Sequence, residues 1–216
     1  MEEIKMEEQV MNDKQILILE TAEKLFAINS YDATSIRDIA NSGSFNSAMI
    51  SYYFGSKEQL MEGILKYRTT KLELILKTTL SAISDPLEKI FALTEFYLQK
   101  VFQQNYFYLL MFQIQSLPEK HQLIKKFYNS LRFKNFQILD GIIRHGQAEN
   151  RFKKDVDTSL LLFVISGTVN TLIVNQDYYR EVNKIEEMSE ENFIAFIKNK
   201  ANILLKGLIK QIVIPS

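Results

Sequence analysis

The residues whose types and spacing could recognise another molecule lie in one short segment, residues 46–54. Within it, Ile50 and Phe54 are spaced so that both face inward on one side of a helix. The remaining side chains then face outward, and they are Ser47, Ala48, Met49, Ser51 and Tyr52. Hydroxyl groups can hydrogen-bond to the edges of DNA bases, and small or flexible apolar side chains suit the methyl group of thymine. Together the residues indicate contact with base edges, although each one taken alone is more often an ordinary solvent-facing residue.

Two helix starts and one turn position this segment. Ser35 followed three residues later by Asp38 has the spacing that begins a helix. The run Asn41-Ser42-Gly43-Ser44 interrupts that helix, because Gly permits positive φ and Asn and Ser bond to local backbone. Asn46 can then cap a second helix, and Ser56 with Gln59 begins a third. Two short helices joined by a tight turn are typical of a helix-turn-helix, which presents its second helix to the major groove of DNA.

The same residues resemble the N-terminal helix-turn-helix of TetR-type transcriptional regulators. The matching positions are Ile18–Phe26, Thr34-Ser35, Ile39-Ala40, Phe45-Asn46, Ala48, Ile50, Tyr53-Phe54, Ser56-Lys57-Glu58 and Leu60. The match covers Ile16 to Ile64, and its joint spacing is more specific than helical periodicity alone. Two positions depart from the family pattern. Ser44 stands where the family usually has a turn Gly, and Ser51 stands where a phosphate-contacting Tyr is common.

The resemblance assigns roles to individual residues. It adds Arg37 to the residues that reach bases, so the expected base-reading set is Arg37, Ser47, Ala48, Met49 and Tyr52. It also implies a set that holds phosphates: Thr34, Ser35, Asn46, Ser51, Tyr53 and Lys57. For the remainder of the chain it implies a helical body that binds an effector and forms a dimer.

Composition favours an all-α fold. The 216 residues are 46% hydrophobic with only 7 Gly and 3 Pro, and sustained period-2 alternation is almost absent. We expect a three-helix DNA-binding domain joined by a long helix to a larger C-terminal helical domain for ligand binding and dimerisation. The expected boundaries are a flexible lead-in over residues 1–12, the helix-turn-helix domain over 13–56, a connecting helix over 57–83 and the effector-binding and dimerisation domain over 84–216. In the last domain, Asp85 and Pro86 have the pattern of a helix start, and Leu117-Pro118 predicts a helix break.

The segment 96–136 holds eleven of the 25 aromatic residues of the chain. Aromatic residues at helical spacing are typical of a packed core and require no ligand. The other interpretation, which the family resemblance favours, is an apolar effector cavity. Its expected lining is Phe96, Tyr97, Tyr108, Met111, Phe112, Phe127, Phe133 and Phe136. Because the segment has phenol hydroxyls and little inward charge, the effector should be mostly apolar.

Two C-terminal helices predict self-association. Residues 160–174 are apolar almost all the way round, but this run is too short to span a membrane, so it predicts a buried helix that follows Asp157. After a polar loop, the last helix should begin at Met188-Ser189. Its predicted apolar stripe is Phe193, Phe196, Ile197, Leu204, Leu208 and Ile212. Such a pair resembles the dimer interface of TetR-type regulators, with expected contacts at Leu160, Phe163, Gly167, Leu204 and Leu208.

The sequence offers little for catalysis. Neither His121 nor His145 has a partner at metal-ligand or nucleophile spacing, and there is no Gly-rich phosphate loop. We therefore expect no enzyme activity, no metal and no cofactor. The absence of Cys and the charged start at Met1-Glu2-Glu3 fit a cytoplasmic protein.

Charge opposes the DNA-binding interpretation, because residues 1–60 hold five basic residues against ten acidic ones. Hydroxyls, backbone N–H groups and helix N-termini can also hold phosphates, which reduces the conflict. The sequence thus predicts a ligand-responsive regulator, most simply a repressor, that binds a near-palindromic operator as a dimer. The alternative is a non-enzymatic helical interaction protein that keeps the helix-turn-helix as a scaffold.

Overall fold

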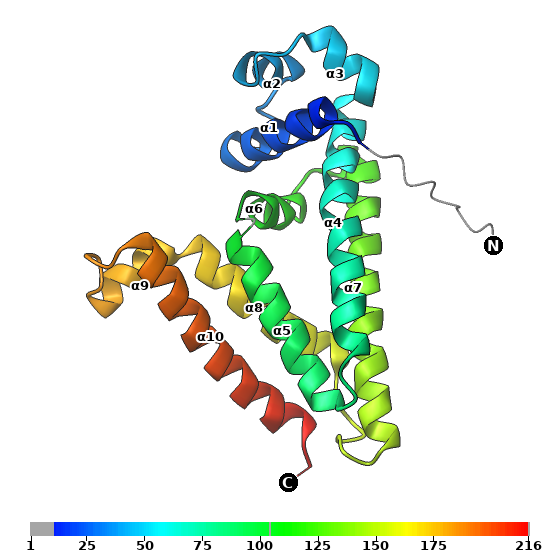
Figure 1. Ribbon diagram of the computed structural model, residues 1–216, viewed down its shortest axis with the longest axis vertical. Coiled ribbons are helices and arrows are strands. Elements are labelled where there is room, and N and C mark those ends of the chain that lie inside the picture. The colour runs from blue at the N-terminus through cyan, green and yellow to red at the C-terminus, as the bar shows by residue number, and fades with distance from the viewer. Residues whose placement is uncertain (1–10, 104, 216) are drawn as a thin grey trace, which may run out of the picture. The chain divides into compact units, whose positions relative to one another are not determined.

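The structure is a computed structural model that describes residues 11–103 and 105–215, apart from the side chains of residues 71 and 105. Every regular element in these ranges is helical. The elements are α1 (Asp13–Asn29), α2 (Ile36–Ser42), α3 (Ser47–Phe54), α4 (Lys57–Ser81), α5 (Pro86–Gln103), α6 (Asn105–Ile114), the 3-10 helix η1 (Glu119–His121), α7 (Gln122–Ala148), α8 (Thr158–Val174), α9 (Gln176–Asn183) and α10 (Glu190–Val213) (Figure 1). The chain divides into a head unit that ends at Lys66 and a body unit that begins at Tyr67, so α4 contributes to both.

The head unit is built on one buried face from each of its helices. The buried apolar residues are Ile18, Leu19, Ala22 and Phe26 of α1, Ile39 and Ala40 of α2, Ile50 of α3, and Leu60, Met61, Ile64 and Leu65 of α4. The predicted helix starts are confirmed. Asn46 caps α3 through its Oδ1, which accepts the Ala48 N–H at 2.9 Å. Ser35 with Asp38 and Ser56 with Gln59 form reciprocal capping boxes.

The turn between α2 and α3 is closed by two backbone hydrogen bonds. The N–H of Phe45 donates to the carbonyl of Ala40 at 2.8 Å, and the N–H of Ser44 donates to the carbonyl of Asn41 at 3.4 Å. Ser44 adopts a left-handed conformation with φ of 55°. This combination is a Schellman motif, whose left-handed position is usually Gly. The geometry therefore explains why Gly is common at this position, and Ser44 occupies it at some cost in stability.

The body unit has one apolar core shared by four helices. In Figure 1, α5, α8 and α10 lie side by side, and α7 packs against α5 and α8. The core includes Ile90, Leu98 and Val101 of α5, Leu139 and Ile143 of α7, Leu161, Ile165 and Val169 of α8, and Ala201, Leu205, Ile209 and Val213 of α10. The predicted starts of α5 after Asp85 and of α8 after Asp157 are confirmed, because each carboxylate accepts backbone N–H groups of its helix.

Two predictions for α8 and α10 need correction. The helix predicted to be buried on all sides, α8, buries Leu161, Ile165 and Val169 but exposes Leu160 and Phe163 in the single chain. On α10 every fourth residue is buried, in the order Phe193, Ile197, Ala201, Leu205, Ile209 and Val213. The predicted stripe was right at Phe193 and Ile197, but Leu204 is exposed. The helix carries two neighbouring apolar rows, and packing against α5 and α8 decides which one is buried.

One further element differs from the prediction. The sequence predicted a polar loop where the structure has α9, whose Arg180 lies over the Phe193 ring at 3.8 Å and pairs with Glu190 at 2.6 Å. These contacts with the start of α10 hold a helix that is too short to be stable alone. The helix break predicted at Leu117-Pro118 is confirmed, because α6 ends at Ile114 and the next helical element, η1, begins at Glu119.

None of the described helices is long and apolar enough to cross a membrane by itself. Helices α8 and α9 meet the length and composition criteria only together, and their axes are bent by 79°.

The left-handed residue in the α2–α3 turn gives a stability prediction. Replacing Ser44 with Gly removes the steric cost of positive φ and should stabilise the head unit by roughly 0.5–1 kcal/mol. Thermal or urea unfolding of the full chain would measure this change. Ser44→Ala is the matched control, because it keeps a Cβ and should not stabilise. Equal stability of all three proteins would contradict the assigned strain.

Candidate nucleic-acid interface

Helix α3 presents a continuous uncharged surface. Ile50 is 1% exposed and anchors the helix, while Tyr52 is 84% exposed. Ser47, Ala48 and Ser51 are also exposed, and Met49 is half-buried. The helix contains no Lys, Arg, Asp or Glu. A surface of hydroxyls, a thioether, a methyl group and a phenol ring can hydrogen-bond to base edges and contact thymine methyls, but it cannot neutralise phosphate charge.

Arg37 lies near the start of α2 and is exposed. It forms no hydrogen bond or ion pair with the part of the chain that the structure describes. Beside it, the hydroxyl and backbone N–H of Ser35 hydrogen-bond to Asp38 and hold the pKa of that carboxyl below its usual range. The acid closest in sequence to Arg37 is therefore committed to capping α2. The guanidinium remains available as a fork of five donors, which suits a guanine edge.

The structure argues against one predicted phosphate contact. Thr34 is only 1% exposed, and its hydroxyl donates to the carbonyl of Ser30 at 2.8 Å and lies 3.3 Å from that of Leu25. A hydroxyl used inside the head unit cannot reach a phosphate. Thr34 instead ties the α1–α2 connection to the end of α1, which is a structural role. This corrects the assignment made from the family pattern.

Lys57 also has a role inside the head unit. Its side chain is half-buried, and its ammonium lies 4.2 Å from the centre of the Tyr31 ring and 5.8 Å from that of Phe26. Burial, together with the nearby Glu58, raises the pKa of Tyr31, so this phenol stays neutral. Lys57 thus contributes packing and a cation–π contact at the start of α4.

The other predicted phosphate contacts keep exposed polar groups. Ser35, Asn46 and Ser51 are exposed, and the Asn46 amide keeps its N–H donors because only its oxygen caps α3. Tyr53 is half-buried, with its ring 5.3 Å from that of Tyr52 and 6.4 Å from that of Phe54. These side chains can supply neutral hydrogen bonds to phosphates, and Lys57 is the one cation of the predicted set.

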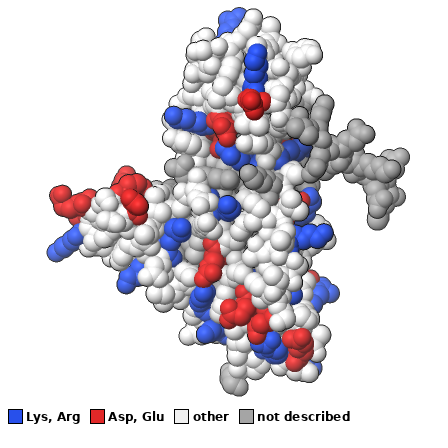
Figure 2. Space-filling model, in the orientation of Figure 1, with Lys and Arg blue, Asp and Glu red and all other residues white. Residues whose placement is uncertain are grey.

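Few charges surround this surface. On the face shown in Figure 2, the upper end of the molecule carries scattered Lys, Arg, Asp and Glu side chains among mostly uncharged residues. The acid excess found in the sequence does not fall on α3. Binding through this surface would depend on shape and neutral hydrogen bonds more than on phosphate neutralisation.

The predicted effector-pocket residues do not form one lining. Phe112 and Phe133 are exposed, at 45% and 60%, and so do not line an enclosed apolar pocket. Phe96, Tyr97, Tyr108, Met111, Phe127 and Phe136 are half-buried. The rings of Tyr97 and Tyr108 meet edge-on at 5.6 Å, whereas Phe133 stacks with Phe136 at 6.3 Å. The aromatic segment therefore contributes two separate ring groups, Tyr97 with Tyr108 and Phe107, and Phe133 with Phe136.

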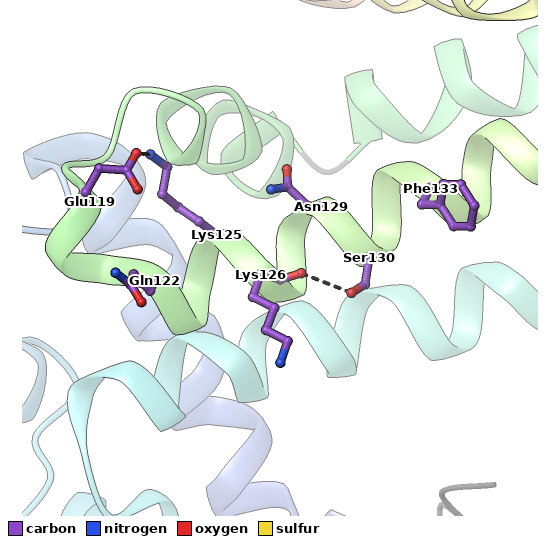
Figure 3. Close-up of a pocket in the computed structure, with 7 residues that line it drawn as sticks. All are labelled: Glu119, Gln122, Lys125, Lys126, Asn129, Ser130 and Phe133. Atoms are coloured by element: carbon purple, nitrogen blue, oxygen red, sulfur yellow. Dashed lines mark hydrogen bonds and ion pairs between the residues drawn. The ribbon is translucent and has the colours of Figure 1, made fainter. Parts of the chain in front are cut away.

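A shallow, open depression of about 520 Å³ lies on η1 and α7 (Figure 3). Its lining is Glu119, Gln122, Lys125, Lys126, Asn129, Ser130 and Phe133. Figure 3 shows Glu119 turned toward Lys125, with which it forms an ion pair, and Phe133 at the far end. A lining of mostly polar and charged residues from η1 and the start of α7 differs from the aromatic cavity that the sequence predicted.

Sequence reasoning missed Asn170. The Tyr97 hydroxyl donates to Asn170 Oδ1 at 3.1 Å, which joins α5 to α8 across 73 positions of the chain. Nothing in the local sequence pattern marks an Asn on an apolar helix as the partner of a distant Tyr.

The structure offers no metal centre in residues 11–103 and 105–215: no group of three or more His, Asp or Glu side chains there could hold an ion. His121 is buried, and His145 lies 3.2 Å from Glu149 on the exposed side of α7.

The head unit and the helical body together define a class, the helix-turn-helix transcriptional regulators with an all-helical C-terminal domain. Residues 18–64 match the family model described as bacterial regulatory proteins, tetR family. Residues 68–199 match the model of the YsiA-like protein, C-terminal region, which covers more than half of the chain. The protein belongs to the TetR family of transcriptional regulators.

Relatives support this assignment. The chain is 31% identical over 140 residues to the probable HTH-type transcriptional regulator YttP of Bacillus subtilis, over 62% of this chain and 65% of that protein, slightly less than two thirds of its length. It is 24% identical over 151 residues to the HTH-type transcriptional repressor KstR2 of Mycolicibacterium smegmatis, over 70% of this chain and 73% of that protein.

A solved structure supports the fold. The chain superposes on a transcriptional regulator from Saccharomonospora viridis in complex with choline, with a TM-score of 0.69 and 21% identity, over 95% of this chain and all of that one. Both the two-part helical architecture and the helix-turn-helix are thus those of the family.

Arg37 and Tyr52 give a prediction for base reading. Substituting either residue with Ala should change the preferred base at one position of each half-site, by about 1–3 kcal/mol if a direct contact is lost. Binding to a panel of single-base operator variants would measure this. Thr34→Val is the control, because it should lower stability without changing base preference. If neither Ala variant alters the preference among bases at any operator position, Arg37 and Tyr52 do not read bases.

Proposed function

We propose that the protein is a repressor that binds a near-palindromic operator as a dimer and is released by a small, mostly apolar effector. The observation that carries this proposal is the exposed, uncharged face of α3, together with the exposed guanidinium of Arg37 on the preceding helix α2, which pairs with no described residue. The expected base-reading set is unchanged, at Arg37, Ser47, Ala48, Met49 and Tyr52. The phosphate-binding set loses Thr34 and keeps Ser35, Asn46, Ser51, Tyr53 and Lys57.

Dimerisation is supported by apolar surface left open on α8 and α10. Leu160 and Phe163 of α8 and Ile203 and Leu204 of α10 are exposed, each by more than half. The half-buried Leu208 follows Leu204 by four residues on α10. Exposed apolar residues on two helices that pack against each other are typical of an interface between chains.

Two glycines strengthen this argument. Gly167 of α8 and Gly207 of α10 lie within helices, where Gly costs about 1 kcal/mol relative to Ala. A Cβ added at either position would meet nothing within 4 Å in the single chain. Packing within the chain therefore does not require Gly at either site. Close approach of a second helix would require it, and a two-fold dimer would also supply two matched half-site readers.

Release by an effector requires a difference in affinity between two states. A ligand lowers operator binding only if it binds the conformation with the wrong head spacing more tightly than the right one. The aromatic segment of the body supports a mostly apolar ligand, because many of its half-buried side chains are uncharged aromatic rings. The regulator from Saccharomonospora viridis was solved with choline, which supports a small-molecule ligand in a body of this fold.

The competing proposal is a non-enzymatic helical interaction protein that keeps the helix-turn-helix as a scaffold. Its best support is the acidic excess of residues 1–60. The two proposals differ in whether the head binds a particular DNA sequence.

A salt titration against the promoter beside the protein's own gene would separate them. We expect specific binding with a shallow slope of log K against log salt, roughly −2 to −4 for a dimer, because each head offers few cations. The control is a scrambled DNA of the same length and composition. Equal binding of both DNAs at low salt would contradict the proposed function and favour the scaffold.

Dimerisation gives a separate prediction. Leu204→Arg should yield a folded monomer with much weaker operator binding, because it places a charge in the proposed interface. Sedimentation velocity would measure the oligomeric state. Leu123→Arg is the matched control, since Leu123 is an exposed Leu of α7 outside the interface and should leave the dimer intact. A wild-type monomer at micromolar concentration would refute this arrangement.

A further inference from the structure

Helix α3 lacks the side chains that make the commonest specific pairings with guanine, adenine and cytosine. In the major groove, Arg and Lys pair with guanine, Asn and Gln pair with adenine, and Asp and Glu accept from cytosine. None of these residue types occurs in Ser47–Phe54. The hydroxyls of Ser47 and Ser51 remain, but a hydroxyl both donates and accepts and so pairs with several bases. Most of the base discrimination by α3 must therefore come from apolar contacts.

Polar side chains that flank α2 and α3 are occupied within the head unit. The Asn46 oxygen accepts the Ala48 N–H at 2.9 Å, so the amide cannot hold adenine through both of its polar atoms. The Ser35 N–H donates to Asp38 at 2.7 Å. At the start of α4, the Ser56 N–H donates to the side-chain oxygen of Gln59 at 3.0 Å. These residues cap helices and do not replace the pairings that α3 lacks.

Three apolar groups lie on the outer side of α3. Ala48 is exposed in the first turn, Met49 follows it and is half-buried, and Tyr52 lies one turn after Ala48 and is 84% exposed. The N-terminal residues of a recognition helix are those that contact base edges. A small methyl group, a flexible thioether and an aromatic ring all suit the C5-methyl group of thymine. That methyl is the apolar group that the four ordinary bases present in the major groove.

Arg37 is the exception to this uncharged surface. It is the only Arg among residues 1–66, and it is exposed on α2, which packs against α3. Its guanidinium has the geometry to hold the O6 and N7 atoms of guanine together. One guanidinium in each head supports the reading of one guanine in each half-site.

We propose that α3 reads thymine methyl groups, so that each operator half-site is A·T-rich where α3 meets it and carries one G·C pair read by Arg37. Ala48, Met49 and Tyr52 make the methyl contacts. This inference rests on the proposed function and adds the class of DNA sequence to it. It also explains how a recognition helix without charge can select a sequence.

The test begins with selection of an operator from random duplex DNA by the full-length protein. Each thymine of the selected half-site is then replaced in turn by deoxyuridine, which keeps the base pair and removes only the C5-methyl group. At one or more thymines of each half-site, the replacement should weaken binding by roughly 3–5-fold, the value of one buried methyl group. The same replacement in the flanking DNA is the control and should leave the affinity unchanged.

Protein variants assign the contacts. Met49→Ala and Tyr52→Ala should each lose the uracil effect at one position, because the contact with that methyl is already absent. Ser47→Ala is the matched control on the same helix and should keep the uracil effect at every position. Arg37→Ala should also keep it, but should relax the preference at the single G·C pair. Thermal unfolding of each variant excludes misfolding as the cause.

The outcomes separate this inference from the proposed function. A selected operator that is G·C-rich in both half-sites, or one in which no uracil weakens binding, overturns methyl reading and leaves the repressor proposal intact. Uracil effects that persist in both Met49→Ala and Tyr52→Ala also overturn the inference. Selection that enriches no sequence rejects the proposed function and the inference with it.

Discussion

The placement of α3 depends on one buried side chain and one strained turn. The helix has eight residues, too few for independent stability in water. Ile50 is the buried residue that holds it to the head core, and the Ser44 turn sets the angle at which it leaves α2. A Cβ at Gly43 would lie 1.9 Å from the Phe45 ring, so a larger residue there would displace that ring. Every residue proposed to read bases from α3 depends on these contacts for its direction.

Several polar and charged side chains of the head unit stabilise its fold. Asp38 caps α2, Lys57 lies over the Tyr31 ring, and the buried Thr34 bonds to backbone, so these three residues stabilise the head. What remains exposed on α3 is uncharged. A protein that reads DNA through such a surface depends on geometric fit, and its affinity should respond less to salt than that of a strongly basic head.

The body unit uses its apolar residues for more than one purpose. One side of α8 and of α10 forms the core, while Leu160, Phe163 and Leu204 remain outside it. The aromatic segment likewise contributes rings to the core, and the Tyr97 hydroxyl joins α5 to Asn170 of α8. Apolar residues that stay exposed outside the core of one chain indicate contact with a partner.

Local signals in the sequence determined much of this protein. Helix starts at Ser35, Asn46, Asp85 and Asp157 follow from side chains that bond to backbone N–H groups within three residues, so the chain needs no distant contact to specify them. The same short range made the helix-turn-helix and its outward-facing residues predictable. The family pattern was less reliable for Thr34, because its role depends on which hydroxyls the head encloses.

Only the tertiary structure decided the remaining features. Two apolar rows on α10 are equivalent by periodicity, and contact with α5 and α8 chose the row that contains Leu205 over the row that contains Leu204. Helix α9 exists because Arg180 contacts Phe193 and Glu190 on another element. The pairing of Tyr97 with Asn170 joins residues 73 positions apart. Hydrogen bonds and packing between distant segments leave no periodic trace in a single sequence, so these contacts could be found only once the helices were in place.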